Sequence, residues 1–130
     1  KLNYKTIKMQ EPFVVFTATD GCFGYLSTPM EFEGLLLNTL LKSKSAAEWE
    51  SELADKISAI AGDDSTICLA SYGYGSYTAL RQAFVNRYSH LKNNYLLPVS
   101  KLSADDREGR FSLWESYREN YMRYIKDGQV

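Results

Sequence analysis

The chain has 130 residues, of which 45% are hydrophobic and 24% charged, a composition typical of a folded domain and not of a disordered segment. Its 15 basic and 16 acidic residues leave a net charge of -1, which excludes the strongly basic footprint of most nucleic-acid-binding domains. No apolar run approaches the roughly 20 residues of a membrane span. We therefore expect a cytoplasmic protein with neither a nucleic-acid partner nor a membrane partner.

The first predicted elements are strands. Residues 4–9 alternate loosely between polar and apolar side chains and predict an edge strand. The aromatic and β-branched run 13–19 predicts a buried strand, and Asp20-Gly21 after it predicts a sharp turn. Because the chain begins close to a strand and with Lys1 instead of methionine, we expect it to be a piece of a longer protein.

Two helices are predicted next. The residues TPME at positions 28–31 form a capping box, and the helix that they open is expected to run to about Lys42. A second capping box at positions 45–48 opens another helix, which Gly62 is expected to end in the C′ position. Residues 66–71 then predict a second strong strand.

The remainder of the chain is predicted to be helical. One helix is expected over residues 78–96, with Pro98 as its stop, and another after a cap at residues 103–106. The last helix carries an apolar and aromatic stripe of Trp114, Tyr117, Tyr121, Tyr124 and Ile125. We expect this stripe to pack inside the molecule, and binding of a partner helix or a nucleic-acid strand is the alternative.

This order of elements predicts an α+β fold in which two helices cover one face of a sheet. We divide the chain into residues 1–72, which hold the strands, and residues 73–130, a helical C-terminal extension. His90, the only histidine, is expected to be a surface or partly packed residue of that extension and not a catalytic one. Cys22 and Cys68 are expected to be buried free thiols, with a disulfide or redox pair as the alternative.

Asp20 and Asp63 are the candidate metal ligands. Asp20 ends one predicted strand and Asp63 precedes the other, so the two carboxylates lie side by side if the strands are neighbours. Magnesium and manganese prefer oxygen ligands, usually one or two carboxylates with several waters. The alternative is that Asp20 belongs to a tight turn and Asp63 to a loop, without a further role.

Three motifs carry a family resemblance: TDGCF at residues 19–23, YLSTPMEFE at 25–33 and DDST at 63–66. Together, residues 13–69 resemble the C-terminal part of the metal-dependent Ser/Thr protein phosphatase family, the protein phosphatase 2C type, in its bacterial branch. The resemblance implies the C-terminal part of an α-β-β-α sandwich, with an antiparallel sheet and a helix pair on one face.

The resemblance also implies a function for the two aspartates. Asp20 and Asp63 would bind one Mg or Mn ion of a site that holds two or more ions, supported by Gly21, Asp64 and Thr66. The family hydrolyses phosphoserine and phosphothreonine in phosphoprotein substrates, with metal ions that activate a bridging water.

The N-terminal half of that family has no counterpart in this chain. That half would supply the remaining metal ligands, the phosphate-binding arginine and the histidine proposed as general acid. We therefore expect no catalytic residue here, little activity from the 130 residues alone, and the missing N-terminal half as a partner. The alternative is a non-catalytic, phosphatase-like binding module that acts through its helical tail.

Overall fold

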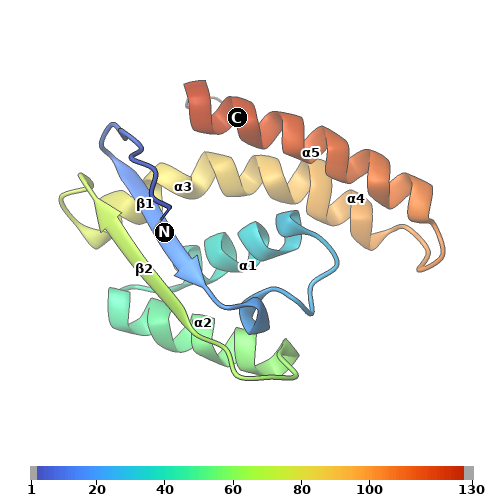
Figure 1. Ribbon diagram of the computed structural model, residues 1–130, viewed down its shortest axis with the longest axis horizontal. Coiled ribbons are helices and arrows are strands. Elements are labelled where there is room, and N and C mark those ends of the chain that lie inside the picture. Colours follow the sequence, from blue (N-terminus) through green and yellow to red (C-terminus); the bar gives the residue numbers. More distant parts are fainter. Residues whose placement is uncertain (1–2, 128–130) are drawn as a thin grey trace.

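The computed structural model describes residues 3–127. Residues 1–2 of the predicted segment 1–72, and residues 128–130 of the predicted segment 73–130, lie outside the described residues. The fold is α+β, as predicted, and its helices surround one side of a small sheet (Figure 1). The 3-10 turn η1 and the π-helical turn η2 interrupt an otherwise regular set of elements. In chain order these are β1 (Phe13–Ala18), η1 (Asp20–Cys22), α1 (Pro29–Lys42), α2 (Ala46–Ile60), β2 (Ile67–Tyr72), α3 (Tyr77–Leu91), η2 (Lys92–Leu96), α4 (Leu97–Ser100) and α5 (Arg107–Asp127).

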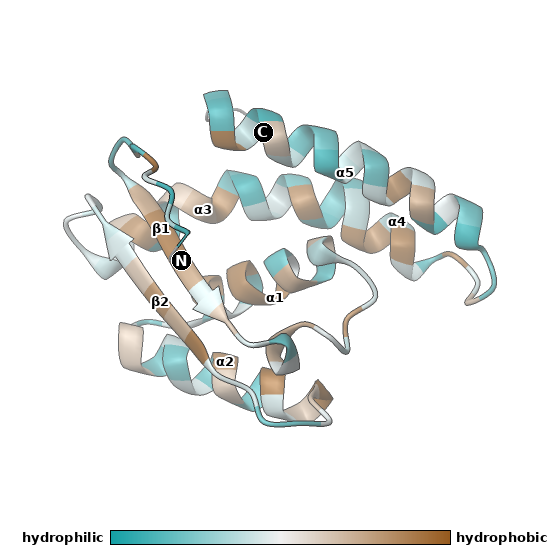
Figure 2. Cartoon of the chain, viewed as in Figure 1, coloured by the Kyte–Doolittle hydropathy of each residue, from teal (hydrophilic) through white to brown (hydrophobic). Residues whose placement is uncertain are grey.

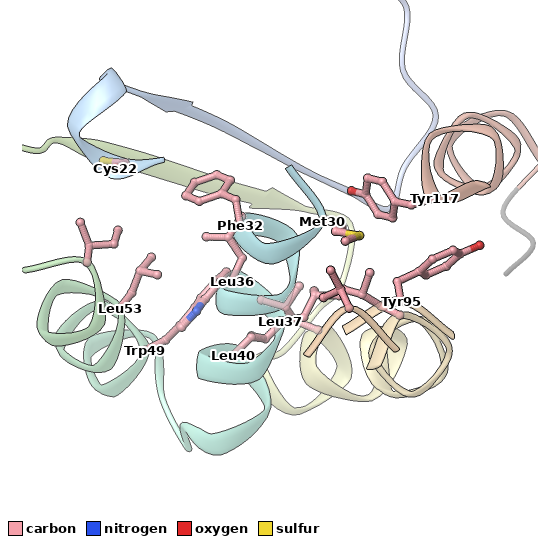
Figure 3. Close-up of a cluster of buried hydrophobic side chains, with 14 residues drawn as sticks. Cys22, Met30, Phe32, Leu36, Leu37, Leu40, Trp49, Leu53, Tyr95 and Tyr117 are labelled. Carbon is pink, nitrogen blue, oxygen red and sulfur yellow. The ribbon is translucent and has the colours of Figure 1, made fainter. Parts of the chain in front are cut away.

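The strands β1 and β2 pair antiparallel, with Phe13 opposite Tyr72 and Ala18 opposite Ile67. One face of the sheet lies on α1 and α2. Figure 3 shows Phe32 of α1 beneath the strands, between the sheet and the helices. The antiparallel register brings the end of β1 and the start of β2 to the same end of the sheet.

The second face of the sheet is open. Val15 is 43% exposed and Tyr72 is 48% exposed, and Figure 2 shows hydrophobic residues along both strands. The expectation that residues 13–19 form a buried strand is therefore wrong. The strand is exposed on this side because no other element of residues 3–127 covers the outer face of the two-stranded sheet.

The N-terminal segment does not form the expected edge strand. Residues 4–9 have no strand assignment, and Tyr4 and Ile7 are 87% and 70% exposed. A strand exists through its pairing with a neighbour, and this segment joins neither β1 nor β2. The loose alternation of its side chains was insufficient to predict a partner.

Both predicted helix starts in the first half of the chain are confirmed. The N–H of Thr28 donates to Glu31 Oε2 at 2.9 Å, which closes the capping box of α1. Ser45 caps α2 by accepting from the N–H of Glu48 at 3.2 Å. In a capping box, the Glu48 side chain would accept from the N–H of Ser45. Here Glu48 Oε2 instead accepts from the N–H of the preceding residue, Lys44, at 2.8 Å.

Gly62 lies at the C′ position of α2, as predicted, but its backbone φ is not positive. The helix α2 ends at Ile60, and its C-cap Ala61 is extended, with φ -71° and ψ 132°. A Cβ at position 62 would lie 2.8 Å from the Tyr25 hydroxyl oxygen, so a larger residue would require the exposed Tyr25 side chain to shift.

Pro98 does not stop the helix that precedes it. The chain passes from α3 through η2 into α4, and Pro98 lies in the first turn of α4, where a missing N–H is tolerated. The N–H of Leu97 donates to the carbonyl of Lys92, a π-helical bond that widens the turn. The prediction of a stop at Pro98 is therefore wrong.

The core lies between the sheet and the helices, with α1 at its centre (Figure 3). Met30, Leu40 and Leu91 are fully buried. Gly34 lets η2 approach α1, because a Cβ there would lie 2.6 Å from Leu96 Cδ1. No helix in residues 3–127 combines the length and the apolar character that a membrane crossing requires.

Candidate metal centre

The turn that follows β1 and the loop that precedes β2 lie at one end of the sheet. The N–H of Thr19 donates to the carbonyl of Thr66 at 2.9 Å, which extends the antiparallel register beyond both strands. Beyond this pair, Asp20 follows directly on the β1 side, and on the β2 side Ser65 comes first, then Asp64 and Asp63. The structure thus places both predicted ligands on segments that are neighbours in space.

Gly21 sets how closely these two segments approach. It is buried, and a Cβ at this position would overlap the main-chain carbonyl of Asp64. Its backbone φ is not positive, so conformational freedom does not explain the glycine. The close contact with the Asp64 carbonyl does explain it, and the supporting role of Gly21 in a metal site stays a prediction.

Thr66 holds the two segments together through its main chain. Its N–H donates to Thr19 Oγ1 at 2.9 Å, and its carbonyl accepts from the Cys22 thiol at 3.2 Å. Sequence reasoning included Thr66 but missed Thr19 and Cys22 as parts of this clamp. A threonine that directly precedes the Asp-Gly turn was the available signal, because its hydroxyl can pair with the backbone of a neighbouring strand.

The carboxylates of Asp20 and Asp63 are exposed, and each bonds the following residue. Asp20 Oδ1 accepts from the N–H of Gly21 at 3.1 Å, and Asp63 Oδ1 accepts from the N–H of Asp64 at 2.8 Å. These local bonds restrict the orientation of each carboxylate and leave the other carboxylate oxygen available. Neither aspartate forms an ion pair with another residue in the described part of the chain.

The donor set suits a hard divalent cation but is incomplete. Carboxylate oxygens are the ligands that Mg²⁺ and Mn²⁺ prefer, and Mg²⁺ usually keeps several waters. Within residues 3–127, no three side chains of histidine, cysteine, aspartate or glutamate gather into one group. The two carboxylates could at most fill part of a coordination shell, and the further ligands would have to come from water or from another polypeptide segment.

The two cysteines have different environments. Cys22 is buried beside Thr66, whereas Cys68 is exposed, and both are free thiols. The expectation of two buried thiols is wrong for Cys68. It alternates along β2 with Ile67 and Leu69, which pack on the core, so its side chain belongs to the open face of the sheet.

The aromatic residues of the α5 stripe pack inside the molecule, as we predicted, but Ile125, which we counted in the stripe, is 59% exposed. Tyr117 is buried, and its hydroxyl donates to Glu33 Oε2 of α1 at 2.7 Å. The centre of this contact is Arg87 of α3, which donates to Glu33 at 2.6 and 2.8 Å. Sequence reasoning did not single out Arg87, and an arginine between apolar helix positions gave no distinctive signal.

Burial and charge shift the ionisation of this cluster. Burial and the neighbouring Glu33 carboxylate raise the pKa of Tyr117 far above that of a free phenol. Burial opposes the charge of Arg87, but the hydrogen bond and the negative charge of Glu33 outweigh it, so the Arg87 pKa is raised. Arg87 therefore stays charged and Tyr117 stays neutral, and the cluster joins α1, α3 and α5.

Comparison with protein-family models gives no match, and neither does comparison with curated proteins or with solved structures.

Proposed function

We propose that this chain is the C-terminal portion of a metal-dependent phosphoserine/phosphothreonine protein phosphatase of the 2C type. The observation that carries the proposal is the close approach of the Asp20-Gly21 turn to the Asp63-Asp64 loop. A Cβ at position 21 would not fit against the Asp64 carbonyl, so this contact depends on the glycine of the Asp-Gly motif. The family resemblance supplies the reaction.

Asp20 and Asp63 would each hold the same Mg or Mn ion through one carboxylate oxygen. Their own turns orient them, because the N–H groups of Gly21 and Asp64 each bond one carboxylate oxygen. Asp64 lies at the surface of this loop and would orient the ligands or their bound waters. When bound, the ions supply an activated water and stabilise charge on the transferring phosphoryl group.

The remaining ligands and the groups that move protons are assigned to the N-terminal half of the phosphatase domain. The open face of the sheet supports this partner, since Val15 and Tyr72 are apolar and exposed there. A two-stranded sheet is marginal by itself, and further strands or a second layer would stabilise it. We place the complete protein in the cytoplasm, where it would act on phosphoproteins.

Metal binding is measured on the chain itself by titrating the ¹⁵N-labelled protein with Mn²⁺. The paramagnetic ion should broaden the amide signals of Gly21 and Asp64 first. Asp20→Asn and Asp63→Asn should each weaken this binding by at least about tenfold, because each removes a charged ligand. Asp105→Asn is the matched control, since Asp105 is an exposed aspartate in the loop before α5.

Equal broadening in the wild type and in both ligand variants would contradict the site. Catalysis is tested separately on the longest natural chain that contains this segment, by Mn²⁺-stimulated turnover of p-nitrophenyl phosphate. Asp20→Asn and Asp63→Asn should abolish that turnover without unfolding the protein. Absence of metal-stimulated turnover in the wild-type parent would contradict the enzyme.

The second candidate is a non-catalytic phosphatase-like module that binds a partner through its helical tail. One observation favours it: α5 exposes Phe111, Met122 and Ile125, which are 57%, 61% and 59% exposed. The turnover assay separates the two functions. The binding module predicts an inactive parent whose partner binding is lost when these three side chains become serine.

A further inference from the structure

The free edge of β2 borders an apolar groove. Within residues 3–127, β2 pairs only with β1, so no strand lies beside its other edge. The groove between this edge and α2 has a volume of about 570 Å³. Residues 67–71 of β2 line one side of it, and Trp49, Leu53 and Ile57 of α2 line the other. Figure 3 shows Leu53 pointing from α2 toward the strands.

The register of the sheet determines which backbone groups face this groove. The N–H of Thr19 donates to the carbonyl of Thr66, and bonded pairs alternate with non-bonded pairs along antiparallel strands. The N–H and C=O groups of Ile67, Leu69 and Ser71 therefore point away from β1, toward the groove. Donors and acceptors at this spacing match the backbone of an added strand.

β2 lacks the usual protection of an edge strand. Natural sheet edges are shielded by charged residues, by proline or by a bulge. The sequence of β2, ICLASY, has no charged residue and no proline, and its register with β1 is uninterrupted. The edge is therefore suited to pairing with a further strand, whose side chains on one face would lie over α2.

The N-terminal segment, residues 4–9, has the properties of such a strand. It has the length of β2, all of its residues are exposed, and it pairs with neither strand of its own chain. Its charge also fits the groove. The segment carries Lys5 and Lys8 and no acidic residue, whereas α2 carries four acidic residues and one lysine.

An antiparallel register places Ile7 opposite Leu69, in the middle of β2. Residues directly opposite each other share one face of a sheet, so Ile7 joins Leu69 on the face that packs on the core. Met9 lies on the same face, toward Ile67, because side chains alternate along a strand. The backbone groups of Ile7 then exchange hydrogen bonds with the outward groups of Leu69.

The same register brings opposite charges together. Lys5 lies on the α2 side of the added strand, toward the Tyr72 end of β2. α2 begins at that end, since the Trp49 ring is 6.5 Å from the ring of Tyr77 (Figure 1). Glu50 lines this part of the groove, where it would meet Lys5. Neither residue forms an ion pair within residues 3–127.

We propose that residues 4–9 of a second copy of this chain add to the free edge of β2 and form a strand-exchanged dimer. The chain cannot fill its own groove in this register, because Met9 would lie at the Ile67 end of β2 while Phe13 is opposite Tyr72. The four steps from Met9 to Phe13 reach about 14 Å, less than the roughly 17 Å between the ends of β2. The dimer does not rest on the proposed phosphatase function, since no candidate metal ligand lines the groove.

Sedimentation velocity of the full chain over a concentration series measures this association. A concentration-dependent dimer is expected. A monomer at all concentrations up to about 1 mM overturns the proposal. A monomer in which the Leu69 amide is protected from hydrogen exchange also overturns it, because the chain would then fill its own groove in another register.

Charge reversal tests the contact between Lys5 and Glu50. Lys5→Glu and Glu50→Lys should each weaken the dimer by about tenfold, because a symmetric dimer contains the pair twice. The double variant should recover the wild-type affinity. Asp55→Lys is the matched control, since Asp55 is exposed on α2 and does not line the groove. An equal loss in Asp55→Lys, or no recovery in the double variant, overturns the proposal.

Two proline variants test the strand pairing. Ile7→Pro removes the N–H that donates to the Leu69 carbonyl, and the dimer should weaken by at least about tenfold. The N–H of Thr6 points away from β2 in this register, so Thr6→Pro should have a much smaller effect. Both positions lie in the exposed segment, so neither change should unfold the chain. Equal weakening by the two prolines overturns the pairing.

Discussion

At the scale of single residues, Arg87 is the buried charge on which the helical packing depends. It is 1% exposed, yet its guanidinium has both polar and aromatic partners. Glu33 accepts two hydrogen bonds, Asn120 accepts a third, and the ring of Tyr124 lies 4.6 Å away. A buried charge is tolerated when its partners are this complete, because the lost hydration is replaced by fixed hydrogen bonds.

Removal of this charge should be strongly destabilising. In Arg87→Leu, the carboxylate of Glu33 stays largely buried without its cation, and we expect a loss of about 3–5 kcal/mol in the free energy of unfolding. Urea denaturation measures the change. Arg118→Leu is the control, because Arg118 is exposed and stacks on one side of Trp114. The account of the cluster is wrong if both variants lose the same stability.

At the scale of elements, the clamp between the end of β1 and the start of β2 depends on one hydroxyl. Thr19 Oγ1 accepts from the N–H of Thr66, whereas Thr17, two residues earlier in β1, makes no side-chain hydrogen bond to residues 3–127. Thr17 lies in β1 and Thr19 directly follows it, and the two threonines differ in this contact. They offer a matched pair for measuring it.

Thr19→Val should destabilise the protein by about 0.5–1.5 kcal/mol, because the exposed Thr66 N–H loses its side-chain acceptor and is left to bond water. It should also speed hydrogen exchange at the Thr66 amide and weaken Mn²⁺ binding, since the Asp20 turn loses its attachment. Thr17→Val should change neither quantity appreciably. Equal exchange at Thr66 in the two variants would show that the hydroxyl does not hold the loop.

The sequence was most informative where structure depends on neighbouring residues. The capping boxes at Thr28 and Ser45 predicted the starts of α1 and α2, since a cap is a contact over three or four positions. Pro98 was misread because its effect depends on whether the turn before it can widen. The edge strand over residues 4–9 failed because strand pairing is decided by distant segments.

For the candidate site, the sequence indicated Asp20 and Asp63 as ligands from their places beside predicted strands, and that assignment stays a prediction. The antiparallel register puts the two segments that carry them at one end of the sheet. The contact of Gly21 with the Asp64 carbonyl depends on how two segments approach, 43 residues apart. No local sequence pattern predicts how closely two such segments approach. The ion pair between Arg87 and Glu33 also joins segments that are far apart in the sequence, so it could not be predicted either.

At the scale of the whole molecule, three tyrosines of α5 should make the free energy of unfolding decrease at alkaline pH. Burial raises the pKa of Tyr117, Tyr121 and Tyr124, and the nearby Glu33 carboxylate raises it further. In the unfolded chain these phenols ionise near a pH of about 10. Their stabilising effect is therefore fully present below that pH and is lost above it, because the unfolded state releases its protons first.

The free energy of unfolding should fall as pH rises through about 10, and urea denaturation at a series of pH values measures this. Tyr117→Phe should reduce the slope, because it removes the phenol with the largest shift. Tyr25→Phe, at an exposed position far from α5 in the sequence, should leave the slope unchanged. A free energy of unfolding that is constant above pH 10 would contradict the burial of these groups.

The unequal exposure of the two thiols has a practical consequence. A thiol reagent added to the folded chain should label Cys68 and spare Cys22, so one cysteine becomes a reporter on the bare side of the sheet without any engineering. A fluorophore at this position would sense the arrival of any polypeptide that covers the strands. The chain therefore carries its own probe for any polypeptide that binds this face of the sheet.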